Sequence, residues 1–241
     1  MEDNKIVKRI VQFSLKLCIL IFFTLILNVN LFAQTQYEFW PEINGFIKLN
    51  DQFRFYLVSA YATGKESEIQ TLDMAANIDI SIKPILGKRR LQKDWQRSRF
   101  LWLRLGYDYI SKQVSGKKNT PENRGMINFY VKGHLPADIW LEGRTRADLR
   151  WIGGEYSTRY RLRLEATREF TVFNHSVVPY LNGEVFYDTR YSGWSRLLIM
   201  AGTEITLNKH LRFELYLAPQ LDYLPKKTNL LALGIVAKLY Y

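Results

Sequence analysis

The chain has 241 residues, one cysteine and a formal net charge of +11 at pH 7, and 47% of its residues are hydrophobic. A lone cysteine excludes an internal disulfide, and no Pro-, Ser- or Gly-rich linker divides the sequence, so we expect one domain or one barrel. The arginines are spread through alternating segments rather than gathered in one cluster, which disfavours a nucleic-acid partner.

Residues 1–33 have the layout of a secretory signal peptide, with basic residues, an apolar run over 17–27 and the small residue Ala33. The run has 11 residues, whereas a spanning helix needs about 20. We expect cleavage after Ala33, which leaves a mature domain of 34–241 with a net charge of +9. Cleavage also removes Cys18; an uncleaved anchor and a lipoprotein at Cys18 are the alternatives.

Large polar residues alternate with small or apolar ones through most of the mature chain, most clearly over 140–150 and 159–165. This two-residue period is typical of a strand with one polar and one apolar face. The pattern predicts strands at 37–49, 51–62, 69–83, 98–111, 122–133, 138–151, 156–169, 176–188, 194–207, 210–222 and 228–241. These strands are longer than the soluble mean of about 5–6 residues and reach the 9–11 that a tilted membrane strand needs.

One parity of these strands is consistently suited to lipid, as over 101–109, 127–131, 197–207, 211–217 and 231–241. Behind an export signal, such strands indicate a closed antiparallel transmembrane β-barrel in the outer membrane of a Gram-negative bacterium. The alternative is a soluble periplasmic β-sandwich, in which the apolar face would need a second sheet.

The connections predict which end of the barrel faces which side. If the C-terminus is periplasmic, the short turns at 134–137, 170–175 and 207–210 are periplasmic and the loops at 111–123, 152–156, 188–194 and 222–228 are external. The long segment 84–97 then falls in the periplasm, although periplasmic connections are expected to be short. Because bacterial barrels close with an even number of strands, we expect ten strands, with 37–49 in doubt, or twelve.

The opposite parity is polar and predicts the lining of the lumen. The candidate lining residues are Arg104, Arg124, Glu142, Arg144, Arg146, Asp148, Arg159, Arg161, Arg163, Glu165, Glu184, Arg196, Glu204, Arg212 and Glu214. In a narrow barrel these charges pair and fill the lumen, because unpaired buried ions are costly. Alternatively, the excess of arginine lines a small anion-preferring channel.

Catalysis and metal binding find little support in the sequence. The three histidines, His134, His175 and His210, fall at predicted turns, and only His175 has an adjacent serine, which points to the opposite face of a strand. No two histidines have a short ligand spacing. We expect no enzyme activity, no metal and no cofactor.

Four segments, 39–43, 100–107, 159–165 and 239–241, together resemble the DUF2490 family of uncharacterised outer-membrane proteins. The resemblance implies an outer-membrane β-barrel and provides no substrate or site residues. The end of the chain also resembles the signal read by the barrel-assembly machinery, through Gly234, Ala237, Leu239 and Tyr241. The other expected partners are membrane lipid and lipopolysaccharide. As a third function class, the barrel is an anchor whose outer loops, such as the lysine-rich tip 116–119, engage a partner.

Overall fold

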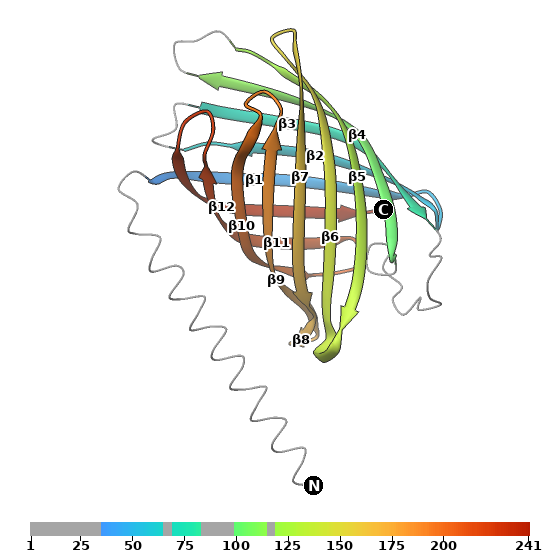
Figure 1. Cartoon of the computed structure of the whole chain (residues 1–241). Helices are drawn as coiled ribbons and strands as arrows, with labels where there is room; N and C mark the ends of the chain where they lie inside the picture. The colour runs from blue at the N-terminus through green and yellow to red at the C-terminus, as the bar shows by residue number, and fades with distance from the viewer. Residues whose placement is uncertain (1–34, 65–68, 83–98, 115–118) are drawn as a thin grey trace. The chain divides into compact units, whose positions relative to one another are not determined.

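Alternating strands make up almost all of the described chain. The computed structural model describes residues 35–64, 69–82, 99–114 and 119–241 (Figure 1). The predicted signal peptide, the segment 84–97 and the lysines of the tip 116–119 lie outside the described residues. The strands are β1 (Thr35–Lys48), β2 (Phe53–Ala62), β3 (Ile69–Ile82), β4 (Leu101–Val114), β5 (Glu122–Leu135), β6 (Ile139–Ile152), β7 (Glu155–Arg168), β8 (Phe170–Val172), β9 (His175–Asp188), β10 (Gly193–Thr206), β11 (Leu211–Asp222) and β12 (Thr228–Tyr240).

The strands form one closed sheet. Strands β1–β7 pair in chain order, β7 pairs with β9, and β9 to β12 continue in order until β12 meets β1. The short strand β8 pairs with β9 and lies outside the ring of eleven. Closure confirms the predicted barrel and shows that the β-sandwich alternative was wrong, since the strands of the described residues form one sheet and none of them makes a second layer over its outward face.

The predicted count of ten or twelve strands was wrong, because all eleven predicted segments are wall strands and 37–49 forms β1. With eleven strands, each antiparallel to the next, the first and last run in the same direction. The Tyr241 N–H donates to Phe46 O (2.8 Å) and the Lys48 N–H donates to Tyr241 O (2.9 Å), the staggered pattern of a parallel pair. A parallel seam between β1 and β12 removes the need for an even number.

Burial alternates along the strands as the sequence predicts. On β5, for example, Ile127 and Phe129 are exposed, whereas Met126, Asn128 and Tyr130 are buried. The outward residues are therefore apolar side chains without protein neighbours over them, and the inward ones fill the barrel. Within the described ranges, no helix has the length and apolar character needed to cross a membrane.

The lumen lining is apolar on one side. Its buried residues on β9–β12 form a hydrophobic cluster of Phe186, Leu198, Tyr216, Ala218, Leu230, Ala232 and Val236. The Tyr216 side chain packs against two glycines of neighbouring strands: a Cβ on Gly234 would lie 2.0 Å from Tyr216 Cζ, and one on Gly202 would lie 2.6 Å from Tyr216 Cβ. Gly234 is required because a side chain there would collide with the Tyr216 ring, and Gly202 because one there would collide with Tyr216 Cβ and the Leu215 carbonyl.

Candidate functional site: the charged wall of the lumen

All fifteen candidate lining residues lie on the inward parity of their strands. Arg104 is on β4, Arg124 on β5, Glu142, Arg144, Arg146 and Asp148 on β6, Arg159, Arg161, Arg163 and Glu165 on β7, Glu184 on β9, Arg196 and Glu204 on β10, and Arg212 and Glu214 on β11. Most of them lie on β4–β9, where they form a continuous charged wall. We use "charged wall" for the inward charged residues of β4–β7 with those of β9.

Asp148 is the central carboxylate of the charged wall and is fully buried. Its Oδ2 accepts hydrogen bonds from Arg159 Nη2 (2.9 Å) and Nε (3.0 Å), and its Oδ1 accepts one from Arg146 Nε. Arg161 Nη1 lies 4.0 Å from Asp148 Oδ2. One carboxylate thus neutralises guanidinium groups on two strands, β6 and β7.

Glu184 likewise neutralises guanidinium groups, and it links three strands. Its Oε1 accepts hydrogen bonds from Arg144 Nη2 on β6 (2.5 Å) and from Arg161 Nε on β7 (2.7 Å). Arg144 and Arg163 are directly opposite each other on β6 and β7, as are Arg146 and Arg161. Opposed like charges destabilise a strand pair, so carboxylates from β6 and β9 are required to hold this four-arginine group together.

Two further carboxylates complete the wall toward its edges. Glu122 Oε1 accepts from Arg150 Nε (2.6 Å) and Arg124 Nη2 (2.8 Å), and Arg150 Nη1 also donates to Asp188 (2.5 Å). Glu142 accepts from Arg163 Nη2 (3.1 Å) and pairs with a lysine of β5. Glu122 was absent from the predicted lining because it starts its strand, where alternation is hardest to read.

The charges of the wall nearly cancel in the described residues. Apart from Arg104, whose partner Asp79 is on β3, its ion-paired residues are eight cations, Arg124, Lys132, Arg144, Arg146, Arg150, Arg159, Arg161 and Arg163, and seven carboxylates, Asp108, Glu122, Glu142, Asp148, Glu165, Glu184 and Asp188. Among these fifteen residues, the excess of arginine that the sequence suggested therefore shrinks to a single charge. Each of these residues has at least one partner of opposite charge.

The N-terminal strands add a second ionic group that the sequence analysis missed. Buried Asp79 on β3 accepts hydrogen bonds from Arg54 Nη2 on β2 (2.6 Å) and Arg104 Nε on β4 (2.6 Å). The Arg104 guanidinium also lies 3.9 Å from the ring centroid of Tyr56, a cation–π contact. The alternation of Asn77, Asp79 and Ser81 with isoleucines was the available signal.

The remaining candidates form two groups on β10–β12. Lys238 Nζ bridges Glu204 (2.6 Å) and Glu214 (2.5 Å), which are directly opposite each other, and Arg212 also pairs with Glu204 (3.2 Å). Arg196 pairs with Asp222 (2.5 Å) in a more exposed position. These groups lie beside the apolar cluster rather than on the charged wall.

The four residues of the predicted assembly signal do not share one face. Gly234 is buried and points inward under the Tyr216 ring, whereas Ala237, Leu239 and Tyr241 have the outward parity. Tyr241 is exposed and closes the seam through its backbone. Gly234 thus has a packing role in the finished barrel.

The histidines lie at the end of the barrel where the C-terminus lies. His210 Nδ1 is 2.7 Å from Tyr240 O and His175 Nδ1 is 3.1 Å from Thr206 O, so both rings contact backbone carbonyls. His134 lies 3.5 Å from Asp138 and packs against Trp140. The described part of the chain contains no group of three or more His, Cys, Asp or Glu residues arranged to hold a metal ion.

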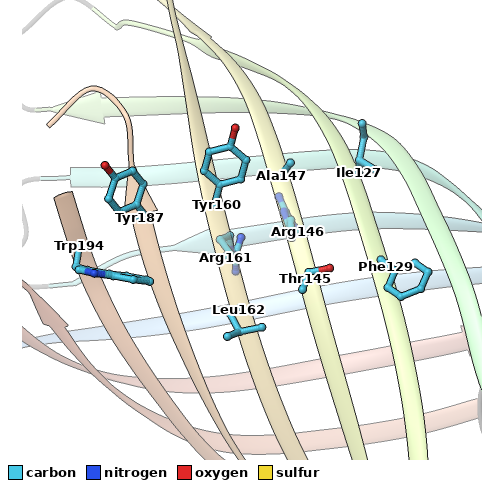
Figure 2. A pocket seen from close by; sticks show the side chains of 10 residues that line it. All are labelled: Ile127, Phe129, Thr145, Arg146, Ala147, Tyr160, Arg161, Leu162, Tyr187 and Trp194. Carbon is cyan, nitrogen blue, oxygen red and sulfur yellow. The ribbon is translucent and has the colours of Figure 1, made fainter. Parts of the chain in front are cut away.

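A shallow groove of about 470 Å³ lies on the outward face. Figure 2 shows its lining residues, which are Ile127, Phe129, Thr145, Arg146, Ala147, Tyr160, Arg161, Leu162, Tyr187 and Trp194. The groove forms where the small side chains of Thr145 and Ala147 on β6 lie between larger ones on β5 and β7. It is a depression in the apolar surface of the wall.

Comparison with known proteins agrees with the strand patterns. The family described as "Protein of unknown function (DUF2490)" matches residues 37–230, which cover β1 to the start of β12. No curated protein matches the chain.

Proposed function

Because the chain belongs to the DUF2490 family, whose function is unknown, we propose its role from the geometry: it is an outer-membrane β-barrel with a lumen closed by paired charges, acting as a membrane anchor or structural protein. The observation that carries this proposal is the burial of the inward polar side chains. Asp148 and Asp79 are 0% exposed and Asn128 is 1% exposed, although all three point into the barrel. These inward side chains therefore have almost no contact with water.

The outward face supports insertion in a bilayer. Large apolar side chains stand exposed around the ring, among them Ile43 (56%), Leu57 (46%), Leu162 (55%), Leu164 (60%) and Leu181 (54%). Soluble monomers rarely expose contiguous apolar patches beyond a few hundred Å². In a bilayer these side chains face hydrocarbon instead of water, so their exposure is not unfavourable. A closed ring also leaves no strand edge without hydrogen-bond partners in the lipid.

The ion pairs of the lumen support the proposal that it is closed. A pore for anions needs cationic groups that face water without a fixed counter-ion, as in basic rings of channels. Here the guanidinium groups of Arg144, Arg146, Arg159 and Arg161 are each bonded to Asp148 or Glu184. Such pairs leave none of these four cations free to attract a passing anion.

Single-channel recording on the refolded mature protein tests the proposal. A heat-modifiable gel band first establishes that the barrel is folded. We expect no steady current from the folded wild-type barrel. Steady anion-selective current would contradict closure and would support the alternative, a small anion-preferring channel.

A lipid-facing substitution tests membrane insertion separately. Leu164→Arg puts a cation on the outward face of β7, where a bilayer costs about 2–4 kcal/mol near its midplane. We expect poorer folding into vesicles for this variant than for Glu155→Gln, an exposed position at the start of the same strand. Equal folding yields would contradict the membrane location.

The proposed partners are those expected from a membrane location and from the last strand of the chain. Membrane lipid and lipopolysaccharide surround the outward face, and the barrel-assembly machinery inserts the chain through its last strand, β12. We assign the barrel no catalytic role.

A further inference from the structure

We propose that the groove on the outward face, together with the loop between β9 and β10, is a binding site for lipid A, the phosphorylated acyl-sugar anchor of lipopolysaccharide. One acyl chain lies in the groove, and a phosphate group contacts Arg190. The inference rests on the proposed outer-membrane location, and it adds to that proposal a defined site for one lipid molecule.

Strand register forms the groove. Its floor is β6, where the outward residues Gly143, Thr145 and Ala147 are small. Thr145 is directly opposite Phe129 on β5 and Leu162 on β7. The floor is therefore one strand wide, and larger side chains of the two neighbouring strands bound it on both sides.

The dimensions of the groove suit a single hydrocarbon chain. Neighbouring strands lie about 4.8 Å apart, so the two walls arise from backbones about 10 Å apart, and their side chains narrow the space further. The small residues from Gly143 to Ala147 cover about 13 Å, at about 3.3 Å per residue. The groove has a volume of about 470 Å³ and a mainly apolar lining (Figure 2). Its shape and lining thus match an acyl chain lying along β6.

Aromatic side chains mark the end of the groove where a lipid head group would lie. Tyr160, Tyr187 and Trp194 are successive partners across β7, β9 and β10, and the rings of Tyr187 and Trp194 are in edge contact, with centroids 5.6 Å apart. Figure 2 shows the two tyrosine hydroxyls pointing to the same end of the barrel. Tyrosine and tryptophan concentrate at the membrane–water interface. The acyl chain therefore extends from this interface into the hydrocarbon layer.

Arg190 supplies a cation at the same end. It lies in the loop 189–192, which joins the strands of Tyr187 and Trp194, and its side chain is exposed. The Arg190 backbone N–H donates to Asp188 Oδ1 (3.0 Å), but the Asp188 carboxylate is already paired with Arg150 (2.5 Å). Among the described residues, no carboxylate is paired with the Arg190 guanidinium. Unlike the arginines of the charged wall, Arg190 can therefore bind a phosphate group through two parallel N–H donors.

A neighbouring loop adds two more cations. The loop between β11 and β12 lies against the start of β10, since the Tyr223 N–H donates to Ser195 O (2.8 Å). This loop carries Lys226 and Lys227, both exposed. With Arg190, they give three exposed cations around this end of the groove, against one exposed carboxylate, Glu155 at the start of β7. The excess of positive charge favours an anionic head group.

The charge also favours lipid A over a second copy of the chain. Copies in one membrane have the same orientation, so a second copy would bring its own Arg190 and lysines to the same depth, where like charges repel. A lipid phosphate brings the opposite charge. The loop 189–192 is at the end of the barrel that is predicted to be external, where lipopolysaccharide forms the membrane surface. Lipid A is therefore the phosphate-bearing lipid within reach of the site.

Native mass spectrometry of the refolded mature protein in non-ionic detergent tests the site. Purified lipid A and phosphatidylglycerol, an anionic phospholipid, are added separately at increasing concentration, and the number of lipids retained per barrel is counted. We expect the wild-type barrel to retain one lipid A molecule at concentrations at which it retains no phosphatidylglycerol.

Two variants locate the binding. Ala147→Leu fills the groove and Arg190→Gln removes the cation; each should weaken lipid A binding about tenfold or more, because the first blocks the chain and the second removes a charged hydrogen bond. The matched controls are Ala201→Leu, a small outward residue of β10, and Lys209→Gln, an exposed lysine at the opposite end of the barrel. Both controls should bind lipid A as wild type does. The heat-modifiable band establishes that each variant is folded.

Three results would overturn the site. These are retention of phosphatidylglycerol equal to that of lipid A, equal lipid A binding by wild type and both groove variants, and a two-chain species that Ala147→Leu separates, which would identify a second copy as the occupant. Vesicles of phosphatidylcholine alone separate the site from the proposed location. A barrel that does not insert into them would overturn the membrane location, whereas an inserted barrel that retains no lipid A would overturn the site alone.

Discussion

On β4–β7 the inward side chains are mostly charged and are fixed by opposite charges, whereas on β10–β12 many are apolar and are fixed by shape. Asp148 and Leu230 are both buried inside the same barrel, the first with arginine partners and the second within a hydrophobic cluster. Strand β9 joins the two halves, since it carries both Glu184 and Phe186. One lumen can thus be filled by two kinds of side chain. The stability of the charged half depends on each counter-ion, and that of the apolar half depends on the volume of each side chain.

The largest effect is expected from Asp148→Ala in the charged half. It leaves Arg146 and Arg159 buried without their shared carboxylate, which typically costs about 3–5 kcal/mol of unfolding free energy. Urea unfolding, followed by the heat-modifiable band, measures the loss. The matched control is Glu155→Ala, at an exposed position at the start of β7. Equal urea midpoints for the two variants would show that the Asp148 carboxylate does not stabilise the arginines around it.

A smaller loss is expected from Gly202→Ala in the apolar half. The new Cβ would lie 2.6 Å from Leu215 O and 2.8 Å from Tyr180 Cζ, so the wall must shift, at about 1–3 kcal/mol. Gly183→Ala is the control on the adjacent strand, because its Cβ would meet nothing within 4 Å. If both variants unfold at the same urea concentration, packing around Tyr216 is looser than the contacts indicate.

The smallest loss is expected from Arg196→Gln. Its partner Asp222 is 2.5 Å away, but the Arg196 side chain is 35% exposed, and water screens such a pair. Exposed ion pairs contribute about 0–1 kcal/mol. A loss as large as that from Asp148→Ala would mean that the two ionic environments do not differ.

The sequence predicted the barrel, its strands and the inward parity of the charged half because alternation is sharp where one face is charged. The segment 159–165 is such a case. On β10–β12 the predicted lipid-facing parity places Leu198 and Leu230 inward, but alternation along single strands does not show that they join one apolar cluster. The group around Asp79 had a readable pattern that was overlooked.

Two features could not be read from local pattern. Alternation says which face Arg144 points to, but its pairing with Glu184, two strands away, depends on strand register and side-chain length. The strand count failed because evenness assumes antiparallel closure, and the direction of the seam between β1 and β12 is a property of the whole ring. Both features arise only when the sheet closes.

The most direct test of the paired charges is a double-mutant cycle on Arg144 and Glu184. Unfolding free energies of wild type, Arg144→Gln, Glu184→Gln and the double variant give the coupling between the two side chains. We predict a coupling of about 1–3 kcal/mol, as for buried groups in direct contact. Additive effects, with a coupling near zero, would contradict the pairing and would mean that the arginines face the lumen as free cations.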